Sequence, residues 1–325
     1  MSNPIPVVIC DDSNLARKQM SKALSRWHVD ITYAEHGLTA LEAIRSGQGD
    51  VLFLDLNMPI MDGYQVLERI RKDDMPTMVI VVSGDIQPEA YRQVLKLGAL
   101  DFIRKPFTED EVAAVLRRFG LLQELEQEDH AIPEDRAVEL PDYYQEIANV
   151  AMGKAGDRLA RLLGTFVHLP VPQVQTVTRT QVESRLKEAA DEQRRIVSQG
   201  FVGAEVAGEA MLSLPQESLE PVAELLNIEF NGTPEVVNEL LMDLSNILIG
   251  AFLKTFGKQL DIEFSCGTPV LLPPMKSLPS DAGSWEKTLS ITIDYGLNEQ
   301  RHSCELMLVF SEASLEPLQR LSSFF

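Results

Sequence analysis

The sequence predicts two domains: an α/β domain with a doubly wound parallel sheet of five strands, and an α+β domain that is internally duplicated. Five strand-like segments alternate with five helix-like segments in residues 1–120, and this alternation is typical of a parallel sheet with helices on both faces. In residues 141–325 a pattern of acidic and amide residues recurs after 97 positions, which indicates two related halves, about 141–235 and 236–325. Residues 121–140 would then form an acidic linker.

Composition argues against several classes of function. The 325 residues carry a formal net charge of −20 and include 3 cysteines. An acidic protein binds phosphate backbones and anionic membranes poorly, so we expect neither a nucleic acid nor a membrane as partner. Few, widely spaced cysteines predict neither a disulfide framework nor a zinc site. No secretory signal is evident, and no apolar run approaches the roughly 20 residues of a membrane helix, so we expect a cytoplasmic location.

The elements of the first domain follow from hydrophobic periodicity. Val51–Leu54 is apolar without alternation, which favours a strand buried on both faces. Between the strands, apolar residues recur at helical spacing. The expected strands are Val7–Cys10, Val29–Ala34, Val51–Asp55, Met78–Ser83 and Asp101–Lys105. The expected helices are Asn14–Trp27, Thr39–Ser46, Gly63–Lys72, Pro88–Leu97 and one that begins near Thr108.

Polar residues stand at the carboxyl ends of four of these strands: Asp11, Asp12, Asp55, Ser83 and Lys105. The carboxyl ends of parallel strands share one edge of a sheet, so we expect these side chains to converge. Three neighbouring carboxylates repel one another and are typical of a site for a hard cation such as Mg²⁺. Lys105 and Ser83 add a cation and a hydroxyl donor for phosphoryl oxygens, which leaves Asp55 to act as a nucleophile that forms an acyl phosphate.

These residues resemble the receiver domain of two-component response regulators, the CheY-like family. The resemblance covers about residues 5 to 120 and rests on the residues above, on DLNMPIMDG around Asp55, and on Pro106 after Lys105. It implies that Asp55 is phosphorylated, with a histidine kinase as phosphodonor and Mg²⁺ as cofactor. By this resemblance Asp12 and Asp55 bind Mg²⁺ directly, Asn57 binds it through its carbonyl, Asp11 binds it through water, Ser83 and Lys105 contact the phosphoryl group, and Phe102 reorients on activation. The Lys105–Pro106 bond would be cis.

The linker is strongly acidic, because Leu121–Glu139 contains seven acids and one arginine. We expect the last helix of the first domain to continue to about Asp129, with a break near Pro133 and a solvated hinge after it. The alternative, a dimerising coiled coil, lacks sustained heptads. A homodimer remains an open possibility.

The second domain contains the repeat. Its first copy consists of Asp142, Glu146, Asn149 and Pro172, and its second copy consists of Glu239, Asp243, Asn246 and Pro269. Further on, Met211–Leu226 matches Met307–Ser322 at a displacement of 96 residues. We expect each half to hold a helix, a β region and a shorter helix, with β regions at Arg195–Pro215 and Lys287–Phe310. The strands would form one sheet with pseudo-two-fold symmetry.

In each copy the first three residues have helical spacing i, i+4 and i+7, so they share one face of a helix. This pattern, with a proline about 22 residues further on, resembles the CheC/CheX/FliY family of phosphatases. The resemblance implies removal of the phosphoryl group from a receiver aspartate, with Glu146 paired to the receiver lysine and Asn149 orienting the attacking water. Asp243 and Asn246 would be the second catalytic pair. Asp243 is one methylene shorter than glutamate, so which copy acts remains open.

Three function classes follow. The first is a phosphatase, controlled by its receiver, whose substrate is a phosphorylated CheY-like response regulator in trans or its own receiver. The alternative is a phosphorylation-controlled binding module that docks on receivers or on chemosensory or flagellar partners without hydrolysis. A DNA-binding regulator is the third class, but no helix-turn-helix with a basic recognition helix is evident, and the charge opposes it.

Overall fold

The computed structural model describes residues 4–119, 140–273, 285–297 and 302–322. The chain divides into two compact units, Met1–Glu146 and Ile147–Phe325, and each is described by itself. The helix expected to continue from residue 121 to about Asp129, with the break near Pro133, lies outside the described residues. The proposed domain limits at about residues 120 and 140 therefore remain a prediction.

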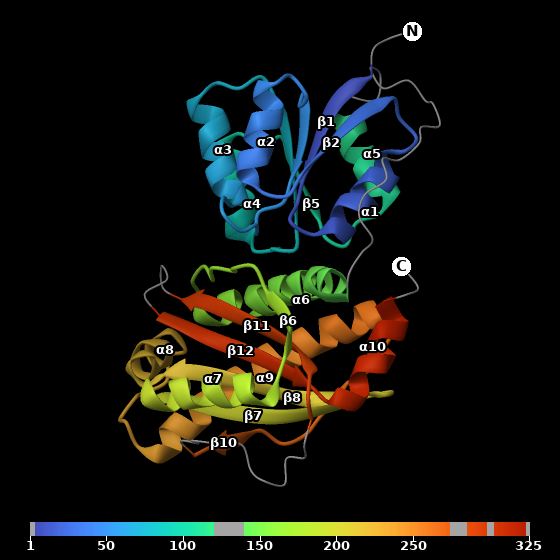
Figure 1. Cartoon of the computed structure of the whole chain (residues 1–325). Coiled ribbons are helices and arrows are strands. Elements are labelled where there is room, and N and C mark those ends of the chain that lie inside the picture. The colour runs from blue at the N-terminus through green and yellow to red at the C-terminus, as the bar shows by residue number, and fades with distance from the viewer. Residues whose placement is uncertain (1–3, 120–139, 274–284, 298–301, 323–325) are drawn as a thin grey trace. The chain divides into compact units, whose positions relative to one another are not determined.

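The first unit contains a parallel five-stranded sheet with helices on both faces (Figure 1), as predicted. The strands are β1 (Ile5–Cys10), β2 (Val29–Ala34), β3 (Val51–Leu54), β4 (Met78–Ser83) and β5 (Asp101–Arg104), in the order β2-β1-β3-β4-β5. The helices are α1 (Asn14–Leu24), α2 (Gly37–Arg45), α3 (Gly63–Lys72), α4 (Pro88–Leu97) and α5 (Glu109–Arg118). Helix α1 ends before Trp27, because Ser25 caps it, yet Trp27 is buried.

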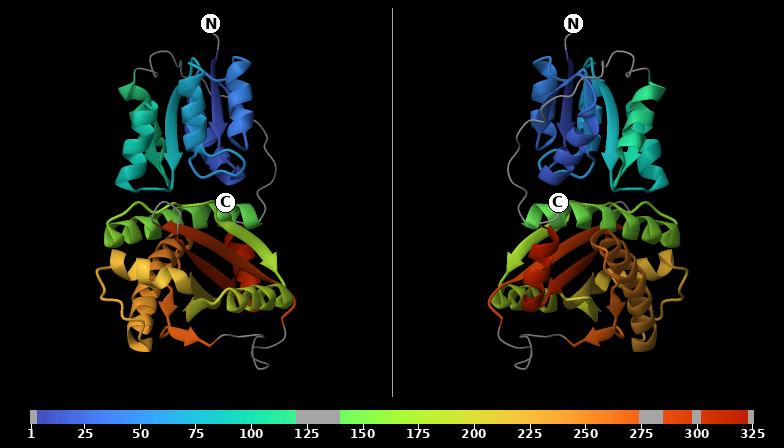
Figure 2. Two further views of the ribbon diagram at one scale, coloured as in Figure 1. Left: turned by 90° about the vertical axis from the view of Figure 1, so that its left-hand side faces the viewer. Right: turned by 90° about the vertical axis from the view of Figure 1, so that its right-hand side faces the viewer.

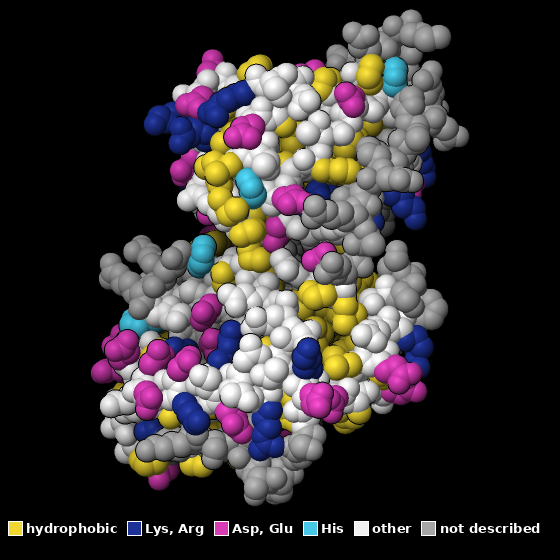
Figure 3. Space-filling view, viewed as in Figure 1, with side chains coloured by type: hydrophobic (Ala, Val, Ile, Leu, Met, Phe, Trp, Pro, Cys, Tyr) yellow, Lys and Arg dark blue, Asp and Glu magenta, His cyan; other side chains and the backbone are white. Residues whose placement is uncertain are grey.

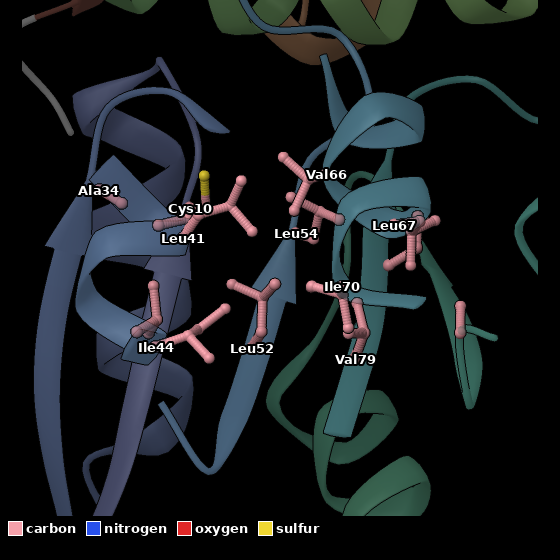
Figure 4. Close-up of a cluster of buried hydrophobic side chains, with 14 of the residues drawn as sticks. Cys10, Ala34, Leu41, Ile44, Leu52, Leu54, Val66, Leu67, Ile70 and Val79 are labelled. Atoms are coloured by element: carbon pink, nitrogen blue, oxygen red, sulfur yellow. The ribbon is translucent and has the colours of Figure 1, made fainter. Parts of the chain in front are cut away.

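Both faces of this sheet are apolar, which explains the uninterrupted hydrophobic strands. Val8 of β1 and Leu52 and Leu54 of β3 belong to a core cluster on one face, shared with residues of α2 and α3 (Figure 4). Val7 and Phe53, their neighbours in sequence, belong to the cluster on the other face. Because successive side chains of a strand point to opposite faces, one apolar run supplies both cores.

Helix α3 illustrates how the sequence fixes element ends. Asp62 caps its N-terminus by accepting a hydrogen bond from the Gln65 backbone N–H, and the Gln65 side chain completes a capping box. Its last turn carries Arg69, Arg71 and Lys72, and basic side chains gather over that end of the helix (Figure 3). Cations at a C-terminus are favourable because they oppose the helix dipole. The helix therefore begins directly after the loop that follows Asp55.

The second unit is built on one seven-stranded sheet with helices on both faces (Figures 1 and 2). Its helices are α6 (Leu140–Leu163, which spans the division between the units), α7 (Arg179–Asp191), α8 (Leu219–Leu225), α9 (Pro234–Leu260) and α10 (Leu315–Ser322). Its strands are β6 (Gln173–Val177), β7 (Arg194–Gly203), β8 (Val206–Pro215), β9 (Ser265–Cys266), β10 (Val270–Leu272), β11 (Thr288–Leu297) and β12 (His302–Phe310). Short 3₁₀ turns, Gln216–Ser218 and Glu312–Ser314, precede α8 and α10.

The pairing of these strands confirms a single sheet with pseudo-two-fold symmetry. The order is β10-β7-β8-β12-β11-β6, with β9 on β7. At the centre, Met211 of β8 lies opposite Met307 of β12, and these two residues are repeat equivalents, 96 positions apart. The halves also exchange strands, since β6 of the first half pairs with β11 of the second, and β10 of the second pairs with β7 of the first. The two halves therefore share one folding unit.

The repeat also explains the two prolines. Pro172 directly precedes β6, and Pro269 directly precedes β10, so each stands at the start of an exchanged strand, where proline is tolerated. The expected plan of one helix, a β region and a shorter helix for each half was incomplete. Helix α7 is an additional element, and it packs through Val182 and Leu186 on the sheet face that carries Met211 and Met307. The opposite face packs against α9, through Phe256 and Phe310.

Helix α9 bears on the expectation that no apolar run approaches the length of a membrane helix. It is long and apolar enough, by length and composition alone, to cross a membrane, and it is the one such helix in the described parts of the chain. Half of its most apolar 18-residue window is buried within the structure. Leu240, Leu244 and Leu248 are fully buried, as expected for the apolar face of an amphipathic helix in a core. One partly buried helix of this kind is weak support for a membrane span.

Leu248→Ala is expected to lower the free energy of unfolding of the second unit by about 3 kcal/mol, because truncating a buried leucine removes apolar contacts and leaves a cavity. Leu248 is fully buried. The chain's two tryptophans, Trp27 and Trp285, lie one in each unit. Trp285 fluorescence in a Trp27→Phe background therefore follows urea unfolding of the second unit. Asn238→Ala, at an exposed position of α9, is the control, and an equal loss in both variants would contradict the assignment.

Candidate functional site

Five chemically active residues lie at the carboxyl edge of the first unit's sheet. Asp11 and Asp12 follow β1, Asp55 follows β3, Ser83 ends β4, and Lys105 follows β5. Strand β3 lies between β1 and β4 in the parallel sheet, so Asp55 occupies the centre of this edge. The topology thus places these residues at one edge, as the sequence predicted.

The Lys105 ammonium joins two of the carboxylates. Its Nζ lies 2.7 Å from Asp11 Oδ2 and 3.1 Å from Asp55 Oδ1. Burial alone would lower the pKa of Lys105, but Asp11 and Asp55 outweigh it and hold that pKa well above its usual value. The Lys105 N–H donates to the Ser83 carbonyl at 2.9 Å, and the Lys105–Pro106 bond is cis, as the resemblance implied. Lys105 is therefore a fixed cation beside Asp55.

The backbone around Asp55 is held from both sides. Its N–H donates to the Cys10 carbonyl at 2.9 Å, and its Oδ2 accepts from the Asn57 N–H at 2.7 Å. Gly63, which begins α3, packs so closely that a Cβ at this position would lie 2.4 Å from the Asp55 carbonyl oxygen. Only glycine lets α3 start this near the strand end. These contacts fix the carboxylate at the end of the rigid strand.

Burial and neighbouring carboxylates raise the pKa values of two acids at this edge, Asp55 and Asp12. Burial raises the pKa of Asp55 to about 7, an effect that Lys105 opposes and Asp11 reinforces. Burial, with Asp11 and Asp55 nearby, also raises the pKa of Asp12 well above its usual value. Asp12 Oδ1 is buried with no hydrogen-bond partner among the described residues. A cation bound at Asp12 would stabilise its charged form, so this donor set fits a hard divalent ion.

The described residues do not form a finished metal site. Nowhere in the ranges given above do three acidic, histidine or cysteine side chains gather with their donor atoms around a common point. Lys105 instead lies against Asp11 and Asp55. The Mg²⁺ role of Asp11, Asp12, Asp55 and Asn57 therefore stays a proposal.

Two further predicted residues occupy the neighbouring strands. The Ser83 hydroxyl accepts a hydrogen bond from the Asp85 N–H at 3.2 Å. Phe102 in β5 is half-buried, and its ring packs edge-on against Tyr91 of α4 with ring centroids 6.0 Å apart. Tyr91 is 42% exposed, so this aromatic pair connects the interior near β5 to the surface of α4.

Arg17 is a site residue that the sequence reasoning missed. It is buried in α1, donates from Nη1 to the Asp11 carbonyl at 2.8 Å, and lies 3.6 Å from Glu35. Its position one turn into α1, after the Asp11-Asp12 pair, was the available signal, because a helix at that point turns its first side chains toward the strand end. Arg17 thus orients the backbone that carries the acidic pair.

The two stripes of acidic and amide residues lie on long helices, as predicted. Helix α6 carries Asp142, Glu146 and Asn149. Helix α9 carries Glu239, Asp243 and Asn246, all exposed. Buried apolar residues stand on both helices as well, namely Ile147, Val150 and Leu159 in α6 and Leu240, Leu244 and Leu248 in α9. Each stripe therefore has a rigid, packed element beneath it.

The structure does not bring the two stripes together. The Gln259 side chain near the end of α9 donates to the Ile147 carbonyl of α6 at 3.1 Å. Asn246 lies thirteen residues before Gln259, which is about 20 Å along a helix that rises 1.5 Å per residue. The second stripe thus lies far from Asn149 and forms a separate candidate site.

Comparison with known proteins assigns the first unit. The family model of the response regulator receiver domain matches residues 7–117. The probable transcriptional regulatory protein NarL of Mycobacterium tuberculosis is 39% identical over 118 residues, which are 34% of this chain and 55% of NarL. The regulatory protein AtoC of Escherichia coli K12 is 31% identical over 122 residues, 38% of this chain and 26% of AtoC. The match thus covers about a quarter to a half of these relatives' own length.

A solved structure is similar over a longer part of the chain. The crystal structure of Thermotoga maritima FliY covers 59% of this chain and 98% of its own length, with 19% sequence identity and a TM-score of 0.45. The receiver domain alone, matched by the family model, indicates a role in two-component signalling.

Proposed function

We infer, from a chain whose residues 7–117 form a response regulator receiver domain, that this protein is a two-component phosphatase of the CheC/CheX/FliY type. Phosphorylation of Asp55 would control a C-terminal domain that hydrolyses the aspartyl phosphate of a CheY-like response regulator. One observation carries this proposal. The same stripe of two acids and an asparagine stands on both long helices, and each is followed by a proline at the start of an exchanged strand.

In the receiver, a phosphoryl group passes from a histidine kinase to Asp55. The Asp55 carboxylate attacks the phosphorus, the nitrogen–phosphorus bond of the kinase phosphohistidine breaks, and an acyl phosphate forms. Lys105, whose Nζ lies 3.1 Å from Asp55 Oδ1, and the Ser83 hydroxyl would contact the phosphoryl oxygens. Asp11, Asp12, Asp55 and the Asn57 carbonyl would hold Mg²⁺, which neutralises charge on the transferred group when it is bound.

In the phosphatase step, water attacks the phosphorus of a receiver acyl phosphate, the carboxylate leaves, and inorganic phosphate is released. The Asn149 amide can hold that water by accepting one hydrogen bond and donating another. Glu146 pairs with the receiver lysine and thereby sets the position of the helix. Phosphoryl transfer gains most from placing the nucleophile in line, so a fixed amide is sufficient chemistry. Asp243 and Asn246 make the second candidate pair.

The proposed substrate is a separate CheY-like receiver in the cytoplasm. A protein that dephosphorylated only its own receiver would pass on little signal. This consideration favours a substrate in trans. The chain's own receiver remains the second candidate, because a coil of about 20 residues spans roughly 25 Å and can give a high effective concentration. Neither arrangement calls for a nucleic acid or a membrane.

Removal of Mg²⁺ is expected to stop phosphorylation of Asp55. With an excess of EDTA and acetyl phosphate as phosphoryl donor, incorporation measured by intact mass should fall to background and return when Mg²⁺ is added back. The reason is the crowding of Asp11, Asp12 and Asp55, which repels an incoming phosphoryl group unless a cation is present. Undiminished incorporation in EDTA would contradict a metal-dependent site.

The competing function is a binding module that docks on receivers without hydrolysis. The two functions are distinguished by mixing wild-type protein with a CheY-like receiver and measuring complex formation and phosphate release in the same samples. Complex formation with beryllofluoride-loaded receiver, together with release faster than the receiver alone, supports the phosphatase. Complex formation with unchanged release supports the binding module.

A further inference from the structure

Arg17 is a buried cation near the N-terminus of α1, at a place where the helix itself gives no reason for one. It is the fourth residue of the helix and is only 4% exposed. A positive charge in the first turn of a helix opposes the helix dipole, and burying a guanidinium costs free energy because it leaves water. The first turn of α1 holds no acidic side chain that would compensate this charge. Arg17 therefore depends on partners outside the helix.

The main partner is the backbone of Asp11, the residue that directly follows β1. Arg17 Nη1 donates to the Asp11 carbonyl oxygen at 2.8 Å. The backbone N–H of Arg17 donates to the Ser13 carbonyl at 3.1 Å, which is the helical bond, so the side chain starts from a fixed turn. Helical side chains tilt toward the N-terminus, and this tilt brings the guanidinium back to the strand end. The contact holds the Asp11 peptide group in one orientation.

The other polar atoms of Asp11 are engaged as well. Its N–H donates to the Ala34 carbonyl at 3.0 Å. One carboxylate oxygen accepts from the Ser13 N–H at 2.9 Å, and the other lies 2.7 Å from Lys105 Nζ. Arg17 supplies the contact on the carbonyl oxygen, and it thereby holds the peptide group that leads to the next residue in the chain.

That next residue, Asp12, is held differently. Its Oδ1 is buried and has no hydrogen-bond partner in the parts of the chain that the structure describes, whereas both carboxylate oxygens of Asp11 are engaged. The place of this oxygen therefore depends on the backbone that carries it. Groups that orient a metal ligand from behind typically change metal affinity by about 10- to 100-fold when they are removed.

We propose that Arg17 is a positioning residue for Mg²⁺ at the acidic edge of the receiver. By holding the Asp11 carbonyl, it presets the Asp12 carboxylate for the cation. Arg17 touches no reacting atom and acts through the backbone alone. This assignment rests on the proposed Mg²⁺ site and adds to it a residue outside the ligand set.

Charge and position predict opposite effects when Arg17 is replaced. A cation beside the site repels Mg²⁺, so removing the charge alone would tighten Mg²⁺ binding. Losing the contact with the Asp11 carbonyl frees the backbone before Asp12 and weakens binding. Glu35 Oε1 lies 3.6 Å from Arg17 Nη2 and offsets part of its charge, so the positional effect should dominate. Weaker binding thus identifies position as the cause.

The Mg²⁺ dissociation constant of the full chain tests this proposal. It is obtained from the rise in the free energy of unfolding of the first unit with Mg²⁺ concentration. Unfolding in urea is followed by the fluorescence of Trp27, which lies in the first unit, in a Trp285→Phe background. Arg17→Met should raise the dissociation constant at least fivefold. Arg17→Lys keeps the charge but loses the planar fork of donors, and it should raise the constant at least twofold.

Leu116→Ala is the control for a general loss of stability. Leu116 is buried near the C-terminal end of α5, so its truncation destabilises the first unit and leaves the contact of Arg17 intact. Its dissociation constant should stay within twofold of wild type. Wild-type or tighter Mg²⁺ binding in the Arg17 variants, or equal weakening in Leu116→Ala, would overturn the proposal, and Arg17→Lys decides if Arg17→Met does not fold. An absence of any Mg²⁺ effect on wild type would overturn the metal site together with this role. Phosphate release by the C-terminal domain does not enter this measurement, so failure of the proposed hydrolysis is detected separately.

Discussion

Asp55→Asn is expected to abolish phosphoryl incorporation into this chain. The substitution keeps the shape of the side chain and an oxygen that can accept from the Asn57 N–H, but an amide is not a nucleophile for phosphorus. Lys105 would keep Asp11 as its partner, so the edge of the sheet should stay folded. With acetyl phosphate and Mg²⁺, intact-mass measurement should show one added phosphoryl group in wild type and none in the variant.

Asp50→Asn is the control for this experiment. Asp50 is an exposed carboxylate that directly precedes β3, whereas Asp55 directly follows it, so the two acids flank opposite ends of the same strand. We expect normal incorporation in this variant. Incorporation that persisted in Asp55→Asn and disappeared in Asp50→Asn, or in a variant at another acid, would assign the phosphorylated residue elsewhere.

Asn149→Ala is expected to lower the rate of phosphate release from a phosphorylated CheY-like receiver by roughly 100-fold, since losing the group that positions a nucleophile has effects of this size. Binding of a beryllofluoride-loaded receiver should change little, because the acidic side chains of the stripe remain. The measurement is a comparison of single-turnover release rates and Kd values for wild type and variant. A parallel loss of rate and of affinity would identify Asn149 as a docking contact.

The second copy of the motif offers an internal comparison. Arg158→Ala, exposed on α6 about 180° around the axis from Asn149, controls for surface changes and should leave the rate intact. Asn246→Ala should reduce the rate of phosphate release only if the second stripe is catalytically active. If the second site is inactive because the Asp243 side chain is one methylene shorter than glutamate, Asp243→Glu should raise the rate of phosphate release in an Asn149→Ala background.

The receiver fold was predictable because its signals are local. Met78–Ser83, Gly63–Lys72 and Pro88–Leu97 were predicted with the bounds that the structure shows. Buried parallel strands give unbroken apolar runs, and their ends place the polar residues at one edge. Errors were limited to element ends, as at Trp27, which is buried although it lies beyond the end of α1.

The second unit was predicted in outline only. The repeat predicted one pseudo-symmetric sheet, and the opposition of Met211 and Met307 confirms it. Helix α7 was missed because only Val182 and Leu186 of its thirteen residues are buried, which leaves a weak helical pattern. The exchange of β6 and β10 depends on pairing between distant segments, and no local sequence signal specifies such pairing. The contacts of Lys105 with Asp11 and Asp55 could likewise not be predicted, because the sequence predicted that these residues share an edge but not which of them touch.

The central claim is that the C-terminal domain hydrolyses a receiver acyl phosphate. Its most direct test is a single-turnover measurement of phosphate release from a purified, phosphorylated CheY-like receiver, with and without the wild-type chain and its Asn149→Ala, Asn246→Ala and Asp55→Ala variants. We expect faster release with wild type, and the loss of most of that acceleration in Asn149→Ala. No acceleration by wild type, in the presence or absence of a phosphoryl donor for Asp55, would contradict the phosphatase assignment for that substrate and leave the binding module as the better account.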